Sequence, residues 1–344
     1  MSPKNLTVSN KTHKLLLNKL KDKRVFNIYK KFEAFLSLQN INENFIVAVS
    51  GGSDSMALAF LSKVYSIKKS LNPKYFIINH KLRKDSSLEA SKVKKLLSKF
   101  LIPLNILTWN GKKPIKNIQS IARDKRYNLL VGKAKKYRIK YILVGHHLDD
   151  LYENFFIRIT RGSGLKGLIS LDKVSKINNF NLIRPLLDIN KKDLIYISQY
   201  IFGFYAKDPS NKDDKFKRVR IRNFLKQLQI EGLDKNKFLL TIKNLKSSNE
   251  SIDYYIKKNL KENVTFVKKN QLVILKQNFF HNSTEVVFRS LTQIVALVGK
   301  RHYPVRGKKI DAILKLIDST SQFKVTLGKC IIKKINKTVI ISKE

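Results

Sequence analysis

The sequence predicts an α/β protein in which a doubly wound parallel sheet is followed by a helical linker and a smaller α+β C-terminal domain. Short apolar runs typical of buried strands alternate with stretches of helical spacing through residues 45–144, and strands that alternate with helices form parallel sheets. After about residue 230 the pattern changes to long basic helices, chiefly at 237–262, and then to short strands. A chain of 344 residues has room for two or three domains.

This pattern divides the chain into three segments. Residues 1–40 are basic and helical in pattern, and we predict that they form an N-terminal extension. Residues 41–230 hold the alternating strands and helices together with the polar clusters described below, so we expect them to form the catalytic domain. Residues 231–344 are the predicted helical linker and C-terminal domain.

The first strand leads into a loop of small residues. Phe45 to Val49 are apolar, and helical spacing begins at Asp54, so the loop Ser50-Gly51-Gly52-Ser53 joins a strand to a helix N-terminus. Glycines let successive backbone N–H groups converge on one point, and the helix end adds partial positive charge. Such a turn favours an anion, most often a phosphate, and we therefore expect a nucleotide ligand.

Two other phosphate loops do not fit this stretch. It lacks the spacing and the lysine of G-x-x-x-x-G-K-[ST], and Asn79-His80 stands where the G-x-G-x-x-G loop would have an acid after the second strand. A serine-rich helix cap would require neither two glycines nor three serines. The loop resembles the S-G-G-x-D-S loop of the N-type ATP pyrophosphatases, the PP-loop family. That resemblance implies an adenine nucleotide α-hydrolase-like fold and cleavage of ATP between its α- and β-phosphates.

Polar clusters follow two of the later strands. In sheets of this kind ligands bind at the carboxyl ends of the strands, so we expect the clusters at 79–87 and 146–150 to face the same crevice as the loop. Helical stretches near 86–100 and 117–138 separate the strand candidates, which lie at 75–79, 104–109 and 140–144.

The stretch HHLDDLYEN at 146–154 concentrates carboxylates in a chain that has few of them. Asp150 and Glu153 lie three residues apart at a helix start, so they share one face and converge on one cation. Acids in the first turn that only offset the helix dipole, and histidines that only pack under the loop, are the alternatives. A mononuclear metal site lacks a third ligand at useful spacing. The cluster indicates a bound ammonium group or Mg²⁺.

The charge balance indicates a polyanionic partner. The chain has 70 Lys+Arg against 25 Asp+Glu, a formal charge of +45. The richness in Lys, Asn and Ile is also typical of AT-biased coding, which accounts for part of the lysine excess. Arginine discriminates better, because a guanidinium binds phosphate bidentately. Nine of the 14 arginines fall between Arg123 and Arg222, which predicts phosphate or RNA contacts there.

Cysteine content and hydropathy limit the class of protein further. The single cysteine, Cys330, excludes internal disulfides and a cysteine-clustered metal site within this chain. We find neither a signal peptide nor a run of eighteen apolar residues, so we expect a cytoplasmic protein without a membrane partner.

Further motifs occur in a fixed order, and together they resemble the tRNA(Ile)-lysidine synthetases along the whole chain. Alone, each motif is weak, since DPSN at 208–211 is most often only a turn. This chain departs from the family at Asn79, Leu151 and Asn154, where relatives usually have Asp, Gln and Thr. After the PP-loop the matched motifs are H-x-L-R with its serines and acid (His80, Leu82, Arg83, Ser86, Ser87, Glu89), A-R-x-x-R-Y (Ala122, Arg123, Arg126, Tyr127), H-H-x-x-D-x-x-E from His146, R-G-x-G-x-x-G-L from Arg161, R-P-L-L from Arg184, D-x-S-N and RVRIR from Arg218.

The resemblance implies a reaction in two steps. The C2 carbonyl oxygen of the wobble cytidine of the CAU-anticodon isoleucine tRNA attacks the α-phosphate of ATP, and pyrophosphate leaves. The ε-amine of free L-lysine then displaces AMP, which forms lysidine and changes codon reading from AUG to AUA. The C-terminal segment resembles the family's tRNA-binding domain, and the chain is compatible with a homodimer.

The resemblance also implies roles for individual residues. We expect Asp54, Asp150 and Glu153 to be catalytic, with Asp54 holding Mg²⁺ and with Asp150 and Glu153 binding lysine. The expected ATP-binding residues are Ser50, Gly51, Gly52, Ser53, Asp54, Ser55, Arg123 and Arg161, and the expected tRNA-binding residues are Arg184, Arg218, Arg220 and Arg222.

Two other functions share some of these features. A tRNA thiolase of the same superfamily would use the same loop and a basic surface, but its sulfur relay or iron–sulfur cluster needs several cysteines. A non-catalytic RNA-binding protein would not require intact SGGSDS and HHxxDxxE motifs. ATP turnover distinguishes the second alternative from an enzyme.

Overall fold

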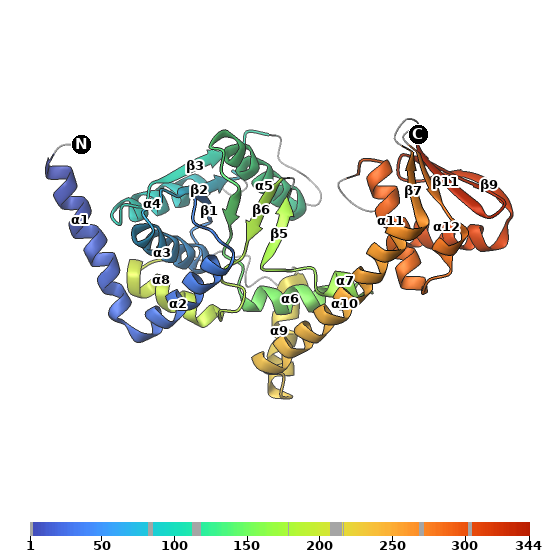
Figure 1. Ribbon diagram of the computed structural model, residues 1–344. Helices are drawn as coiled ribbons and strands as arrows, with labels where there is room; N and C mark the ends of the chain where they lie inside the picture. Colours follow the sequence, from blue (N-terminus) through green and yellow to red (C-terminus); the bar gives the residue numbers. More distant parts are fainter. Residues whose placement is uncertain are drawn as a thin grey trace. The chain divides into compact units, whose positions relative to one another are not determined.

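The computed structural model describes residues 3–81, 85–111, 118–177, 179–206, 215, 217–267, 272–301 and 305–344. The chain divides into two compact units, Met1–Leu233 and Asp234–Glu344 (Figure 1). None of the helices in the described ranges combines the length and the apolar character needed to cross a bilayer.

A six-stranded sheet in the order β3-β2-β1-β4-β6-β5 forms the centre of the first unit. The predicted α/β class and parallel pairing are confirmed for β1, β2, β3, β4 and β6, whereas the edge strand β5 pairs antiparallel with β6. The strands are β1 (Phe45–Val49), β2 (Lys74–Asn79), β3 (Leu104–Thr108), β4 (Tyr141–Leu143), β5 (Val174–Ile177) and β6 (Phe180–Ile183).

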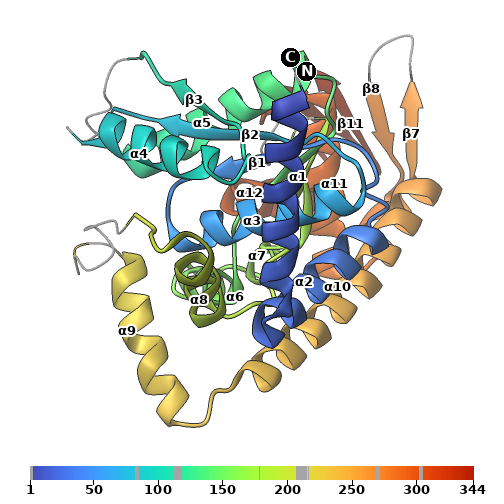
Figure 2. The same ribbon diagram turned by 90° about the vertical axis from the view of Figure 1, so that its left-hand side faces the viewer.

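Helices cover both faces of this sheet, because its central strand is apolar on both sides. In β1, Phe45 and Val47 pack into a core with α2, α3 and α8, while Ile46 points to the opposite face and packs against α5. Helix α4 packs against β2 and β3 (Figure 2). The helices of this unit are α1 (Pro3–Asn18), α2 (Lys23–Leu38), α3 (Ser53–Lys68), α4 (Ser86–Ser98), α5 (Ile118–Lys136), α6 (Leu148–Ile159), α7 (Leu165–Leu168), α8 (Lys191–Phe202) and α9 (Lys217–Ile230), with a short 3₁₀ helix at Lys19–Lys21.

The second unit is a helix-covered antiparallel sheet in the order β7-β8-β11-β10-β9. In β11, Val339 and Ile341 are buried on the face covered by α11 and α12, whose own apolar residues complete the core. Its elements are α10 (Lys235–Asn263), β7 (Val264–Val267), β8 (Leu272–Leu275), a 3₁₀ helix (Gln277–Phe280), α11 (Thr284–Val298), α12 (Gly307–Ser319), β9 (Gln322–Thr326), β10 (Cys330–Ile335) and β11 (Thr338–Lys343).

The sequence located most elements within a few residues of their observed bounds. The strands at 174–177 and 180–183 were not predicted, because each is only four residues long and carries no strong apolar run. The turn DPSN at 208–211 and the motif residues Leu82 and Arg83 lie outside the described residues.

Gly299 provides a test of packing in the second unit. A Cβ atom at this position would lie 2.1 Å from the carbonyl oxygen of Gly328 and 3.0 Å from that of Val295. Because both neighbours are backbone atoms, we expect Gly299→Ala to lower the free energy of unfolding in urea by about 1–3 kcal/mol. The control Gly132→Ala, in α5 with no atom within 4 Å of the added carbon, should raise it by about 0.5–1 kcal/mol. Equal effects of the two substitutions would contradict this account.

Candidate active site

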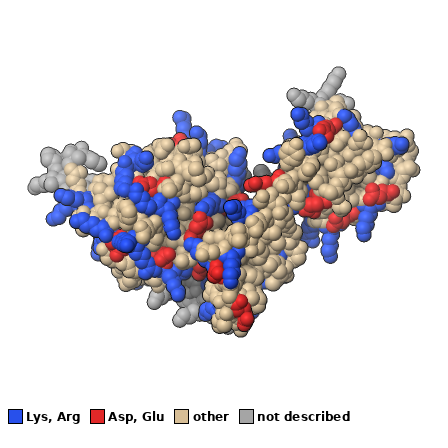
Figure 3. All heavy atoms as spheres, turned by 60° about the horizontal axis from the view of Figure 1, so that its bottom comes forward, with Lys and Arg blue, Asp and Glu red and all other residues tan. Residues whose placement is uncertain are grey.

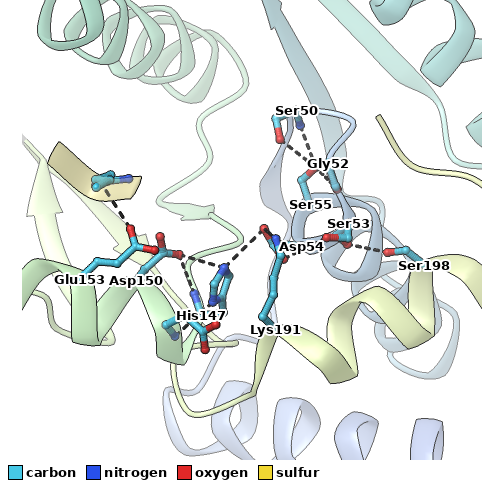
Figure 4. A network of polar contacts seen from close by, with 12 residues as sticks. Ser50, Gly52, Ser53, Asp54, Ser55, His147, Asp150, Glu153, Lys191 and Ser198 are labelled. Atoms are coloured by element: carbon cyan, nitrogen blue, oxygen red, sulfur yellow. Dashed lines mark hydrogen bonds and ion pairs between the residues drawn. The ribbon is translucent and has the colours of Figure 1, made fainter. Parts of the chain in front are cut away.

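The loop after β1 is shaped by its own serines. The hydroxyl of Ser55 accepts hydrogen bonds from the amide and the hydroxyl of Ser50, at 3.0 and 3.1 Å, and donates to the carbonyl oxygen of Gly52 at 2.9 Å (Figure 4). Ser53 begins α3, and Gly52 at the N-cap has no side chain that could occupy the first-turn N–H groups. Those N–H groups and the helix dipole remain available for an anion.

Two glycines allow close approaches around this loop. Gly51 adopts a φ of +87°, and a Cβ there would lie 2.9 Å from a methyl group of Val93. Gly145 follows β4, and a Cβ there would lie 3.2 Å from the backbone of both Asp54 and Ser55. The end of β4 therefore presses directly on the first turn of α3.

Asp54 is the meeting point of three elements. Both of its carboxylate oxygens accept from the ammonium of Lys191, the first residue of α8, at 2.7 and 2.6 Å. The Nε2 atom of His147, which precedes α6, lies 3.6 Å from Asp54 Oδ2. Ser198 of α8 also donates to the carbonyl oxygen of Ser53 at 2.6 Å. The start of α3 is thus held between α8 and α6 (Figure 4).

Asp150 belongs to the same network through His147. The amide of His147 donates to Asp150 Oδ2 at 3.1 Å, and His147 Nδ1 accepts from the amide of Asp149 at 3.2 Å, so the pair caps α6. His147 Nε2 lies 3.5 Å from Asp150 Oδ2. Burial raises the pKa of Asp150, but His147, His146 and the amide of His147 outweigh that effect and the net pKa is lowered. Asp150 is therefore held as a carboxylate.

Glu153 has a different environment one turn further along α6. Its side chain is only 1% exposed, Oε1 accepts from Nε of Arg222, and Arg218 Nε lies 3.9 Å from Oε2. Oε2 is buried and has no hydrogen-bond partner among the described residues. Burial raises the pKa of Glu153, and Arg222 offsets this only in part. The site thus holds one acid that stays ionised and one that accepts a proton more readily.

The two arginines reach Glu153 because α9 packs against α6. Phe156 of α6 and Phe224 of α9 meet edge to face, with ring centroids 5.9 Å apart. Arg218 and Arg222 lie one turn apart on α9 and so point to the same acid.

His146 is held neutral beside Asp150. Its pKa is lowered to about 3, mainly by burial, and Asp150 opposes that shift. The positive charges of Arg184, Arg123 and Arg218 contribute smaller parts of the same lowering. Three arginines from separate elements therefore act on one point beside Asp150, which favours an anionic ligand.

The structure gives less support to the predicted contacts of Arg184 with tRNA and of Arg161 with ATP. Arg184 is buried, and its Nη1 donates to the carbonyl oxygen of Asp172 at 2.6 Å and to Ser175 Oγ at 2.9 Å. This burial favours a supporting position inside the crevice over a contact with tRNA at the surface. Arg161 is exposed beyond the far end of α6, whose 12 residues span roughly 18 Å. The structure does not bring it to the loop.

The remaining predicted arginines lie on exposed or partly exposed positions. Arg123 stacks its guanidinium over the ring of Tyr127, at 5.0 Å from the ring centroid. Arg220 is exposed on α9 and donates to the carbonyl oxygen of Lys215 at 3.1 Å. On the face drawn in Figure 3, lysine and arginine side chains are spread widely, with acidic groups among them. The surplus charge is therefore not confined to one patch of that face.

The sequence departure at Asn79 has a structural counterpart. Its side-chain oxygen accepts from the amide of Lys81 and the hydroxyl of Ser86, both at 3.0 Å, and its amide donates to Ser87 at 2.8 Å. Asn79 thus fixes the turn between β2 and α4 with one acceptor and one donor. An aspartate would have to accept every one of these bonds.

Three residues of the network were not predicted as site residues: Lys191, His147 and Ser198. Lys191 is one of 56 lysines in the chain, so nothing in its residue type distinguishes it. The one signal for Lys191 in the sequence was its place at the start of the helix that follows the RPLLD motif.

The described residues offer no group of three or more His, Cys, Asp or Glu side chains that could hold a metal by themselves. Asp54 nevertheless suits a shared Mg²⁺, because magnesium in nucleotide sites binds one or two carboxylates together with phosphate oxygens. Its carboxylate, 22% exposed, already faces a cation in Lys191.

These features define a PP-loop domain. A buried strand leads into a glycine loop that is held by serine hydrogen bonds, and the helix that follows has free N–H groups and an acid, Asp54, in its first turn. A family model described as a PP-loop domain matches residues 22–229 of this chain.

Curated relatives specify the family more narrowly. The tRNA(Ile)-lysidine synthase of Orientia tsutsugamushi is 33% identical over 88% of this chain and 70% of its own length. That of Wolbachia pipientis is 31% identical over 88% of this chain and 71% of its own. That of Rickettsia akari is 30% identical over 92% and 74%. The chain belongs to the tRNA(Ile)-lysidine synthase family.

Among solved structures, a U34-tRNA thiolase from Methanococcus maripaludis, described with its 4Fe–4S cluster, is similar with a TM-score of 0.57. The match covers 65% of this chain and 80% of that one at 18% sequence identity. This likeness supports the fold of the nucleotide-binding domain.

Gly145 tests the contact between β4 and the loop. An added methyl group would press on the backbone of Asp54 and Ser55 at 3.2 Å, so we expect Gly145→Ala to displace the loop by a few tenths of an ångström. Misplaced catalytic groups are costly, and ATP turnover should fall on the order of tenfold. The control Gly164→Ala, with no atom within 4 Å of the added carbon, should leave turnover unchanged. Loss of turnover in both variants would contradict the proposed contact.

Proposed function

We propose that this chain joins free lysine to C2 of the wobble cytidine of the CAU-anticodon isoleucine tRNA, with ATP converted to AMP and diphosphate. The observation that carries the proposal is the continuous network from the loop through Asp54 and His147 to Asp150, with Glu153 one turn further along α6 (Figure 4). A turn suited to phosphate and a pair of acids suited to a cation therefore lie close together, which supports a ligation of lysine to an adenylated base.

In the first step the loop would hold the phosphates of ATP. The first-turn N–H groups of α3 would bind the pyrophosphate, which carries increasing charge as it leaves. The hydroxyl of Ser53 donates to Asp54 Oδ1 at 3.3 Å and would have to exchange this bond to reach a phosphate oxygen. Ser50 and Ser55 keep the loop in shape through their mutual hydrogen bonds. Arg123 and Arg184 supply further positive charge beside the attacking carbonyl oxygen of cytidine.

Asp54 would exchange partners when the nucleotide arrives. Its carboxylate would hold Mg²⁺, and a bound Mg²⁺ would neutralise charge on the leaving phosphate oxygens. Lys191, released from Asp54, is within reach of the same phosphates, since its ammonium already lies at the carboxylate. A cation therefore stands at this position with or without the nucleotide.

Asp150 and Glu153 have different roles toward lysine. Asp150, whose pKa is lowered, stays ionised and holds the incoming ammonium. Glu153, whose burial raises its pKa, is the better proton acceptor. Its Oε2 accepts no hydrogen bond from the described residues, so it offers the lysine a buried hydrogen-bond acceptor. The amine must lose a proton before it attacks C2. Arg222 keeps Glu153 charged enough to take that proton.

Surface arginines and the second unit would bind the tRNA. Arg218 and Arg220 are exposed on α9 beside the acid pair, where they can reach the phosphates that flank the acceptor cytidine. The proposed chemistry uses groups of a single chain, so the predicted homodimer is not required. We infer a cytoplasmic location, because the proposed substrates, tRNA, ATP and free lysine, occur in the cytoplasm.

The thiolase alternative is disfavoured by sulfur chemistry. The single cysteine, Cys330, is buried in the second unit, so the catalytic unit of this chain offers no thiol for a sulfur relay or cluster.

The proposal predicts the products of ATP. In the presence of tRNA we expect AMP and pyrophosphate to accumulate, and Asp54→Asn to lower turnover roughly 10²-fold or more, because the lost charge acts mainly in the transition state. Chromatography of labelled ATP measures both. The control Asp193→Asn removes the same charge from α8, where the acid binds Arg24, and should retain turnover. Accumulation of ADP would overturn the assignment.

A second prediction separates the two half-reactions. Glu153→Gln should weaken the use of lysine about ten- to a hundredfold, the value of one charged hydrogen bond, and leave tRNA adenylation largely intact. AMP release with and without lysine measures the two steps. Asp149→Asn, a neighbouring acid in the first turn of α6, is the matched control for charge. Equal loss in both half-reactions would place Glu153 with the ATP site instead.

A further inference from the structure

The second unit contains a hollow that the proposed chemistry does not use. It has a volume of about 550 Å³ and lies between the end of α10, strand β7 and the C-terminal half of α11. This volume falls in the range of sites that bind small ligands. The residues that line it are Leu260, Phe266, Gln293, Ile294, Ala296, Leu297, Lys300 and Arg301.

The walls of this hollow are apolar and unusually exposed. The ring of Phe266 on β7 is 51% exposed, and the side chain of Leu297 on α11 is 62% exposed. Ile294 is buried beneath them and also belongs to the core of the unit. An exposed aromatic ring on a supported strand presents a flat face on which another ring can stack.

The rim carries two cations whose backbone is fixed. Arg301 donates its amide to the carbonyl oxygen of Ala296 at 2.9 Å, and Lys300 adopts a φ of +47°, the arrangement that ends a helix in a tight turn. Gly299 between α11 and these residues lies directly against Gly328. The positions from which the two cationic side chains project are therefore set by the fold.

The lining residues combine an aromatic face, an amide and two cations, and none of them is acidic. A ligand that matches must present a flat ring beside a negative charge. We propose that the hollow binds one unpaired nucleotide of the tRNA, with its base on Phe266 and Leu297 and its phosphate at Lys300 and Arg301. Gln293 can donate to and accept from an edge of the base.

This inference rests on the proposed function for the choice of RNA. The chemistry itself requires only an unpaired base and its phosphate, since base stacking on an aromatic ring is tolerant of sequence. A paired base inside a helix has no free face, so the nucleotide must come from a loop, a bulge or an end.

The test measures binding of tRNA to the full chain. We expect Phe266→Ala to weaken the affinity about 5- to 100-fold, as for the loss of one stacked base, and Phe266→Trp to retain it. Because the natural chain has one tryptophan, Trp109, the added indole supplies a second readout: its emission should be quenched when tRNA binds. Lys300→Gln should reduce the salt dependence of log K by roughly 0.7–0.9.

A substitution at an exposed position changes the charge of the hollow without disturbing the core of the unit. Leu297→Glu places a carboxylate in the hollow at an exposed position and should lower tRNA affinity at least tenfold. The matched control is Leu240→Glu on α10, where the leucine is 57% exposed and does not line the hollow. Equal affinities for these two variants, or a Phe266→Trp emission unchanged by tRNA, would overturn the inference.

The outcome also distinguishes this inference from the proposed function. If lysine is still transferred to tRNA while the hollow variants bind tRNA normally, the hollow has another occupant and the inference is wrong. If the hollow variants lose affinity for tRNA but no lysine is transferred, the inference stands and the proposed function is wrong.

Discussion

The structure of the catalytic unit depends on the charge of Asp54. This carboxylate stands at the start of α3, 22% exposed, and a charge that is partly withdrawn from water is stabilised by an opposite charge or by hydrogen-bond donors. Lys191 supplies the cation from α8, and His147 brings α6 to within 3.6 Å. Three elements that are distant in the sequence thus converge on one side chain. Any ligand that binds at Asp54 must displace or share Lys191, so the proposed binding of the nucleotide there would be coupled to the positions of α8 and α6.

Arginines place positive charge close to the acids of this site. Burial, together with Arg184, Arg123 and Arg218, lowers the pKa of His146 to about 3, so this histidine stays neutral close to three guanidinium groups. On α6, by contrast, Asp150 and Glu153 are acids that experience different environments. Guanidinium groups close to a pair of acids are what the proposed reaction between a nucleotide and lysine would need.

The sequence predicted the parts of the site that are local and chemically distinctive. The loop from Ser50 to Ser55 was recognisable by its local order of serines and glycines after a strand, and the acids on α6 because the chain has only 25 Asp+Glu among 344 residues. Lys191 was not, because a single lysine among 56 carries no signal until the fold places it at Asp54. Arg184 and Arg161 show the converse, because their motifs were visible in the sequence but their positions were not. The burial of Arg184, and the position of Arg161 beyond the far end of α6, are seen only in the structure. The antiparallel β5 was missed because two four-residue strands lack periodicity.

The most direct test of the account asks where lysine goes. The chain is incubated with ATP, Mg²⁺, radiolabelled lysine and total tRNA, and the recovered tRNA is digested to nucleotides and separated. We expect one labelled nucleotide, a cytidine derivative from the wobble position of an isoleucine tRNA, whose label survives mild alkali because it is held by a carbon–nitrogen bond. Label that mild alkali releases from the 3′ end as an ester, or tRNA that stays unlabelled while AMP forms, would contradict the account.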